Sequence, residues 1–158
     1  MRITELFLKN FGKFQDKKIA LSDGINLIYG ENESGKSTVY TFLRGMLFGM
    51  ERGRGRAAIK DNFSKYEPWS NPNSYSGTLR FTCDGKHFCL NRNFDKYSKC
   101  AFLFCEDDGE EFSIEHGDLE ILIGGLKELD YDNTVAVGQN KVLVGNELAE
   151  ELKNAFRV

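Results

Sequence analysis

The stretch GENESGKST, from Gly30 to Thr38, has the residue types and the spacing of a phosphate-binding loop. It matches the Walker A pattern, in which a glycine is followed after four residues by Gly-Lys-Ser. The glycines let the backbone curl so that consecutive N–H groups face one anion, and the helix that follows adds the positive end of its dipole. Lys36 supplies a cation for the β- and γ-phosphates, Ser37 a hydroxyl for Mg²⁺ and Thr38 a hydroxyl near the α-phosphate. These residues predict a site for ATP with Mg²⁺.

The segments on either side of the loop are those that such a loop needs. Residues 25–29 are nearly all apolar, which is typical of a short strand buried on both faces. After Ser37, apolar side chains recur at helical spacing as far as the region of Gly49. They are Val39, Phe42, Leu43, Met46, Leu47 and Met50. A buried strand before the loop and an amphipathic helix after it argue against a glycine-rich turn without function.

The loop by itself leaves several classes of protein open. A GTPase needs an Asn-Lys-x-Asp guanine reader, and the nearest string, at residues 140–143, ends in Leu143 instead of aspartate. A small-molecule kinase or self-sufficient small NTPase needs a carboxylate at the end of a second buried strand. Asp107 follows the apolar residues 101–105 and is the candidate, although residues 106–110 have the composition of a hairpin turn. A regulatory module that binds nucleotide without hydrolysing it is a third possibility.

The rest of the chain predicts an α/β fold with few helices. Residues 2–10 and 14–21 alternate like a strand pair joined by a corner at Gly12, and residues 51–74 predict a long loop. From residue 75 the period is two, which predicts an antiparallel meander with a tight turn at Asp84-Gly85. Its strands are expected at residues 75–83, 86–94, 99–105 and 111–114. A short helix at 118–126, a strand at 133–137 and a helix from 146 complete the prediction.

Composition limits the class of protein, the binding partners and the cellular location that we expect. A length of 158 residues with 41% hydrophobic content suits one soluble domain or part of one. The net charge of −3 gives no general affinity for nucleic acid, so any such contact needs a local patch. No apolar run is long enough to span a membrane, and residues 1–10 alternate like a strand and do not resemble a signal peptide, so we expect a cytoplasmic protein.

Two further sets of residues bear on binding. Four cysteines are present, but their spacing places partners on opposite faces of strands, which disfavours zinc. Residues 51–60 hold Arg52, Arg54, Arg56 and Lys60 against the single acid Glu51. This basic loop predicts a weak, salt-sensitive contact with the DNA backbone in an assembled protein, although a solvated loop has the same composition.

Together these segments resemble the N-terminal half of an SMC-like ATPase head. The similarity is strongest to the YhaN-type AAA family, which is related to the ATPases of DNA double-strand-break repair and chromosome maintenance. The resemblance implies a P-loop NTPase half-lobe with a mixed sheet and an antiparallel meander. It is carried by Met1-Arg2-Ile3, FGKF at 11–14, GIN at 24–26, the Walker A loop, YEPW at 66–69, YSG at 75–77, DGK at 84–86, NRNF at 91–94 and NTVAVGQ at 133–139.

The resemblance also implies roles for single residues. Gln139 is similar to the Q-loop glutamine, which reaches Mg²⁺ and the attacking water and serves catalysis. Asn32 corresponds to a loop asparagine near the γ-phosphate, and Ser34 and Gly35 complete the loop. Lys13 lies where a basic residue approaches the nucleotide, although the repair ATPases have arginine one place earlier, at Gly12 here. Glu33 occupies a loop position that usually holds a small residue.

Finally, the resemblance implies partners and a division of the chain. The expected partners are the C-terminal half of the head, a second head in a head-to-head homodimer, DNA and a nuclease. No signature motif or Walker B carboxylates are recognisable, so we expect ATP hydrolysis only in the completed head. The expected division is a P-loop segment (1–50), the basic loop (51–74), the antiparallel sheet (75–115), a Q-loop segment (127–145) and the start of a coiled-coil helix (146–158).

Overall fold

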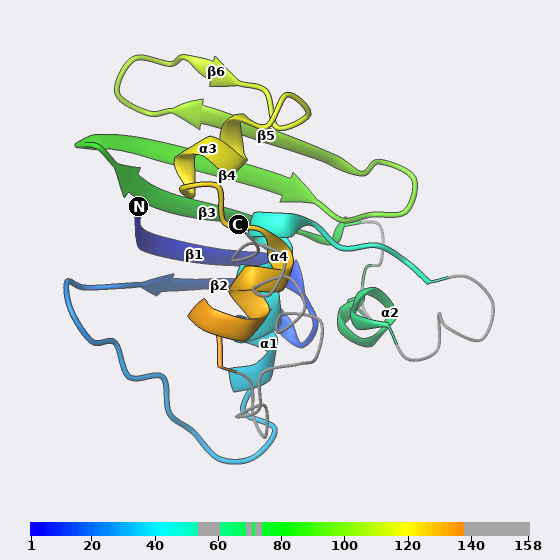
Figure 1. Cartoon of the computed structure of the whole chain (residues 1–158). Coiled ribbons are helices and arrows are strands. Elements are labelled where there is room, and N and C mark those ends of the chain that lie inside the picture. The colour runs from blue at the N-terminus through cyan, green and yellow to red at the C-terminus, as the bar shows by residue number, and fades with distance from the viewer. Residues whose placement is uncertain (54–60, 69–70, 72–73, 138–158) are drawn as a thin grey trace, which may run out of the picture.

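A six-stranded antiparallel sheet forms the centre of the molecule (Figure 1). The computed structural model describes residues 1–53, 61–68, 71 and 74–137. The strands lie in the order β2-β1-β3-β4-β5-β6, and each neighbouring pair is antiparallel. Their bounds are β1 (Arg2–Phe11), β2 (Phe14–Ala20), β3 (Ser76–Cys83), β4 (Lys86–Asn93), β5 (Cys100–Cys105) and β6 (Glu111–Phe112). The predicted strand pair and the predicted meander are both confirmed, and β1 joins them into one sheet by pairing with β3.

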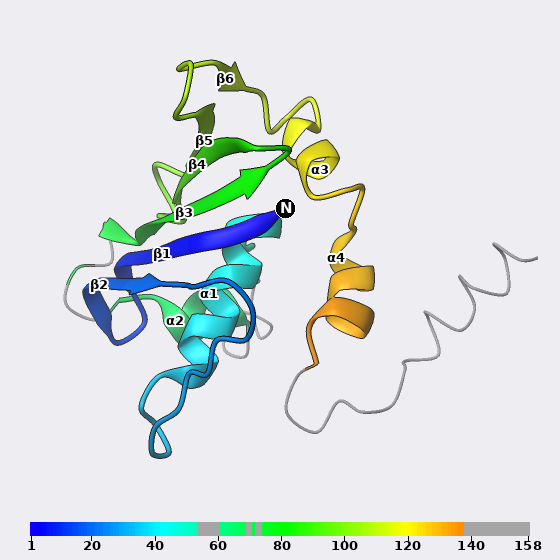
Figure 2. The ribbon, with the colours of Figure 1, turned by 90° about the vertical axis from the view of Figure 1, so that its left-hand side faces the viewer.

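One long helix packs on this sheet, against β1, β3 and β4 (Figure 2). The helical elements are α1 (Lys36–Phe48), α2 (Asn62–Tyr66), α3 (Asp118–Leu122), α4 (Glu128–Asp130) and a π-helical turn (Tyr131–Val135). The helix predicted after the Walker A loop is confirmed as α1, which ends where Gly49 adopts a positive φ of 84°. Among the described residues, no helix is long and apolar enough to cross a bilayer.

The core lies between α1 and one face of the sheet. Its central row is four buried leucines that pair directly across β1, β3, β4 and β5. They are Leu6, Leu79, Leu90 and Leu103. Phe42 and Met46 of α1 are fully buried in the same cluster. The row keeps its register because the two-residue turn after β3 has positive φ at both Asp84 (49°) and Gly85 (79°), the conformation that suits a tight hairpin.

Gly77 is the position where this packing leaves no room for a side chain. A Cβ atom at Gly77 would overlap the Phe42 ring and lie 2.8 Å from the Phe7 carbonyl oxygen. We expect Gly77→Ala to lower the free energy of unfolding by about 1–3 kcal/mol, because the ring of α1 must move away from the sheet. Urea denaturation measures this change. Ser76→Ala, on the other face of the same strand, is the control; an equal loss in both variants would contradict the packing argument.

The strand predicted at residues 25–29 is not formed, so that prediction is wrong for this structure. These residues have no regular structure, and Ile25 (98% exposed), Leu27 (81%) and Tyr29 (85%) face solvent. A strand is stable only when a neighbour pairs with its backbone. No strand among the described residues pairs with this segment, so the pairing that would make the sheet mixed is missing.

The strand predicted at residues 133–137 is also wrong. The chain forms the π-helical turn there, and Val135 and Val137 are 61% and 71% exposed. The side chains of Asn133 and Thr134 donate to the carbonyl oxygens of Leu129 (2.7 Å) and Asp130 (2.6 Å), four residues earlier. These local bonds favour helical backbone where no described strand offers a partner.

Within the described residues of the predicted loop at 51–74, the helix α2 is an element that the prediction missed. Asp61 caps the N-terminus of α2 by accepting a hydrogen bond of 2.6 Å from the Ser64 N–H. Phe63 and Tyr66 of this short helix are buried in the core. The helix predicted at 118–126 is present as the shorter α3.

Candidate nucleotide-binding site

The loop from Gly30 to Gly35 turns sharply into α1. Gly35 has φ of 108° and lies at the N-cap of α1, and no side chain caps the helix or places an acid in its first turn. The N–H groups of that turn are therefore available to an anion. A Cβ atom at Gly30 would lie 2.6 Å from Ser34 Oγ, so the loop closes too tightly for a larger residue there.

The two lysines of the site are held by carbonyl oxygens of the loop itself. Lys36 Nζ donates to the carbonyl oxygens of Gly30 (2.6 Å) and Glu31 (2.8 Å). Lys13 Nζ, from the turn between β1 and β2, donates to the Glu33 carbonyl oxygen (2.5 Å). A phosphate competes well for such ammonium groups, because hydrogen bonds to an ionised acceptor are stronger than those to a neutral carbonyl.

The remaining predicted residues of the loop differ in exposure. Asn32, Ser34 and Ser37 are exposed, whereas Thr38 is buried. Glu33 is exposed and has a positive φ of 65°, a conformation in which glycine is unstrained. The predicted loop residues are thus brought together with Lys13 at the N-terminus of α1.

The turn between β1 and β2 supports the loop, a role that the sequence did not reveal. The Phe14 ring lies where a Cβ atom of Gly35 would be, and a Cβ atom of Gly12 would lie 2.9 Å from the Thr38 methyl carbon. The Gly12 N–H donates to the Tyr66 carbonyl oxygen (2.7 Å), which ties the same turn to α2. The FGKF motif therefore packs directly under the phosphate-binding loop.

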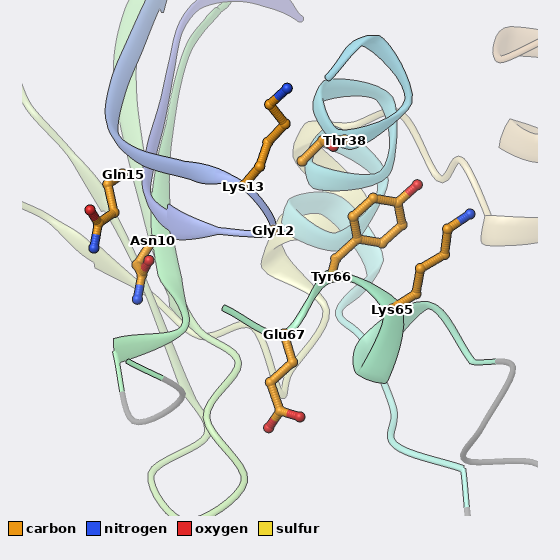
Figure 3. A pocket seen from close by; sticks show the side chains of 8 residues that line it. All are labelled: Asn10, Gly12, Lys13, Gln15, Thr38, Lys65, Tyr66 and Glu67. Atoms are coloured by element: carbon orange, nitrogen blue, oxygen red, sulfur yellow. The ribbon is translucent and has the colours of Figure 1, made fainter. Parts of the chain in front are cut away.

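A cavity of about 410 Å³ opens beside the loop. It shares Thr38 with the loop and Lys13 with the turn between β1 and β2, and in Figure 3 the side chains of Lys13 and Tyr66 flank Thr38, whereas Glu67 points away. The complete lining is Asn10, Gly12, Lys13, Gln15, Thr38, Lys65, Tyr66 and Glu67. This lining combines an aromatic ring with polar groups, a combination that is common in small-molecule sites.

Several predicted residues lie outside the described part of the chain. They are Gln139, the basic residues Arg54, Arg56 and Lys60, and the helix expected at 146–158. Of the basic loop, Arg52 is described, and its guanidinium carbon lies 5.9 Å from the centre of the Phe63 ring. Within the described residues, no group of three or more His, Cys, Asp and Glu side chains could hold a metal ion.

Asp107, the carboxylate of the self-sufficient alternative, lies far from the loop. It follows β5, whereas the loop packs on Phe14 at the start of β2, four strand positions away. With strands about 4.8 Å apart, this separation is about 19 Å across the sheet. Asp107 also accepts hydrogen bonds from the backbone (2.6 Å) and the ring Nδ1 (3.0 Å) of His87, which lower the pKa of its carboxyl group. Asp107 therefore does not reach a metal ion at Ser37 in this arrangement.

The chain is similar to several known proteins. A family model described as an AAA domain matches residues 5–153. DNA double-strand break repair Rad50 ATPases are 31% identical over 90 residues in Archaeoglobus fulgidus and 28% identical over 113 residues in Pyrococcus abyssi. These matches cover 57% and 70% of the chain but only 9% and 12% of the relatives. The protein YhaN of Bacillus subtilis is 35% identical over 69 residues, which are 43% of the chain and 6% of YhaN.

A solved structure shares the fold over nearly the whole chain. It was described for the ATP-driven dimerization and DNA-stimulated activation of SMC ATPases, and it superimposes with a TM-score of 0.60 at 19% identity. The match covers 98% of this chain and 99% of that chain. The predicted α/β fold and the predicted resemblance to an SMC-like ATPase head are therefore confirmed.

Proposed function

Because the chain belongs to the family of AAA domains, we propose that it is the ATP-binding, N-terminal part of an SMC-like ATPase of DNA repair or chromosome maintenance. The observation that carries this proposal is the loop from Gly30 to Thr38 at the uncapped N-terminus of α1. An uncapped helix start with Lys36 beside it attracts a polyphosphate through both its N–H groups and its charge. The Rad50 relatives are repair ATPases by name, which supports the pathway.

The residues present fit a magnesium–nucleotide complex better than a metal held by protein alone. Mg²⁺ commonly keeps one or two protein ligands and takes the others from phosphate and water. The exposed Ser37 hydroxyl in the first turn of α1 is a suitable ligand, and Gln139 is the proposed second one. When bound, Mg²⁺ would neutralise charge on the β- and γ-phosphates. Lys36 would bind the same phosphates, and Asn32 would contact the γ-phosphate.

The nucleoside fits the cavity beside the loop. Thr38 belongs to the loop and also lines the cavity. A nucleotide whose phosphates bind at Lys36 would therefore extend past Thr38 toward Lys13 and Tyr66. Lys13, which lines the cavity and bonds to the Glu33 carbonyl oxygen, offers a cation near the α-phosphate. A volume of about 410 Å³ is in the range of small-molecule sites.

Two exposed apolar segments support the proposal that the C-terminal half of the head binds this chain. Ile25, Leu27 and Tyr29 on one segment and Val135 and Val137 on another are all more than half exposed. Both segments have sequences that favour strands but lack a strand to pair with among the described residues. A partner that supplies the missing strands would bury both. We further propose that the completed head forms homodimers and associates with a nuclease.

Isothermal titration calorimetry of the purified chain with Mg-ATP tests the proposal. We expect one saturable site per chain that also binds Mg-ADP, whereas AMP binds much more weakly because it lacks the β-phosphate that Lys36 contacts. Titration at equal ionic strength with AMP and with inorganic triphosphate separates the phosphate contribution from that of the base. Absence of saturable Mg-ATP binding to folded protein would refute the assignment.

The basic loop gives a separate prediction about DNA. Replacing Arg52, Arg54 and Arg56 by glutamine should lower the DNA affinity of the completed head and flatten its salt dependence, by a slope of about 0.9 for each phosphate that is no longer neutralised. Fluorescence anisotropy with a labelled duplex at several salt concentrations measures both quantities. Lys96→Gln, on the exposed turn before β5, is the control. Equal affinities and slopes would identify residues 51–60 as a solvated loop.

A further inference from the structure

The helix α1 has a second interface in addition to its contact with the sheet. Tyr40, Arg44 and Phe48 recur at a spacing of four and so form one stripe along α1. All three side chains are only partly buried. Arg44 pairs with Glu128 and Asp132, Phe48 contacts Tyr131, and Tyr40 interacts electrostatically with Asp132. The segment from 128 to 135 is thus attached to the helix that begins with the phosphate-binding loop.

Arg44 makes the central contact of this interface. Its Nε donates to both carboxylate oxygens of Asp132 (2.9 and 3.1 Å), and its Nη2 donates to Asp132 Oδ2 (2.8 Å). The same Nη2 lies 2.8 Å from Glu128 Oε1. The side chains of Arg44 and Asp132 are 23% and 25% exposed, so the pair is partly shielded from water and is screened less than a surface ion pair.

Two tyrosines lie near this ion pair. The Tyr131 ring lies 5.3 Å from the Phe48 ring, and burial raises the pKa of the Tyr131 phenol to about 12. Burial and the Asp132 carboxylate raise the pKa of the Tyr40 phenol. Both phenols therefore stay neutral at physiological pH and add no repulsion toward Asp132.

The ion pair adds a directional contact to a segment that is otherwise held by apolar burial, because Tyr131 and Ala136 lie in the core. Val135 and Val137, on either side of Ala136, are mostly exposed. Local sequence favours a strand there and not a π-helical turn. Arg44, about two turns after Lys36, therefore provides a short and rigid connection from the loop to residues 128–137.

We propose that Arg44 and Asp132 are positioning residues that make residues 128–137 follow α1 when nucleotide binds to the loop. This inference rests on the proposed ATP binding. Anions at the N-terminus of α1 fix its first turn, and a bidentate pair transmits a small shift of the helix because it has one preferred geometry.

Hydrogen–deuterium exchange of the whole chain, with and without Mg-ATP, tests the proposal. In the wild-type protein, saturating Mg-ATP should slow exchange of peptides from 128–137. Arg44→Gln and Asp132→Asn should each speed exchange of these peptides about tenfold without nucleotide and abolish the protection by Mg-ATP. The affinity for Mg-ATP by calorimetry should change less than about threefold, because neither residue lies in the loop. The double variant should behave like either single variant, as expected for residues that act as a pair.

Two controls separate positioning from general stability. Peptides from β3 and β4 report global unfolding and should keep the wild-type exchange rate in all variants. Arg80→Gln removes an arginine that pairs with Glu5 and Glu106 on the sheet and should leave peptides 128–137 unchanged. Tight Mg-ATP binding to the wild type without protection of 128–137, or equal acceleration in β3 and β4, would overturn the inference. A wild-type chain that binds no Mg-ATP would refute the proposed function, and the coupling with it.

Discussion

Replacing Lys36 by alanine should weaken Mg-ATP binding by about ten- to a hundredfold, since a charge-assisted hydrogen bond contributes about 1.5–3 kcal/mol. The Lys36 ammonium group lies beside the N-terminus of α1, where it bonds to the carbonyl oxygens of Gly30 and Glu31. Binding therefore exchanges two neutral acceptors for phosphate oxygens without a large movement of the side chain. Calorimetry at one fixed salt concentration gives the change in affinity.

The matched control for this variant is Lys9→Ala. Lys9 is an exposed lysine of β1 whose removal changes the net charge equally. Lys13→Ala should give an intermediate loss, because Lys13 lies in the cavity lining and bonds to the loop through Glu33. If circular dichroism shows that both proteins are folded, equal affinity of Lys36→Ala and the wild type would show that the loop does not bind the nucleotide.

The elements that sequence predicted correctly are those in which local pattern and tertiary packing agree. The meander was predicted from the alternation of apolar and polar residues and from the turn at Asp84-Gly85. With a tight turn at that place, one strand register buries all the apolar side chains on the same face. The row from Leu6 to Leu103 is the result of that register. In the same way, α1 followed from its apolar stripe, and Gly49 ended it.

Prediction failed where structure depends on a neighbour that the described chain does not supply. Residues 25–29 and 133–137 have strand-forming sequences, yet both remain without a ladder. Propensity alone is too weak to order a strand, because most of its stability comes from the backbone bonds and side-chain contacts that pairing provides. Under the proposed function, these two segments are the proposed contact sites for the C-terminal half of the head.

The ligand-binding residues of the candidate site were predictable from the sequence, but the residues that pack against them were not. The motif gave Lys36, Ser37 and Thr38, since the spacing of a phosphate loop is fixed by the geometry of its ligand. Contacts between Phe14 and Gly35, and between Gly12 and Thr38, join residues far apart in sequence, and no periodicity encodes them. The ion pair between Arg44 and Asp132 is likewise a long-range contact that only the fold reveals.

The chain from 1 to 158 should turn over ATP negligibly by itself, and addition of the C-terminal half of the head should raise the rate by at least about a hundredfold. Hydrolysis needs a carboxylate beside Mg²⁺, a group that orients water and donors for the charge that develops on the γ-phosphate, each of which contributes about a hundredfold or more.

Asp107 is the described carboxylate whose sequence context best matches that role. It accepts a hydrogen bond from His87 and lies about four strands from the loop. The C-terminal half would supply the missing groups and cover the exposed residues 25–29, so solubility and rate should rise together. A coupled phosphate-release assay measures the rate, with Lys36→Ala as the inactive control. Rapid hydrolysis by the chain alone that Asp107→Ala abolishes would instead establish a self-sufficient enzyme, in which Asp107 reaches the nucleotide after a large rearrangement of the sheet.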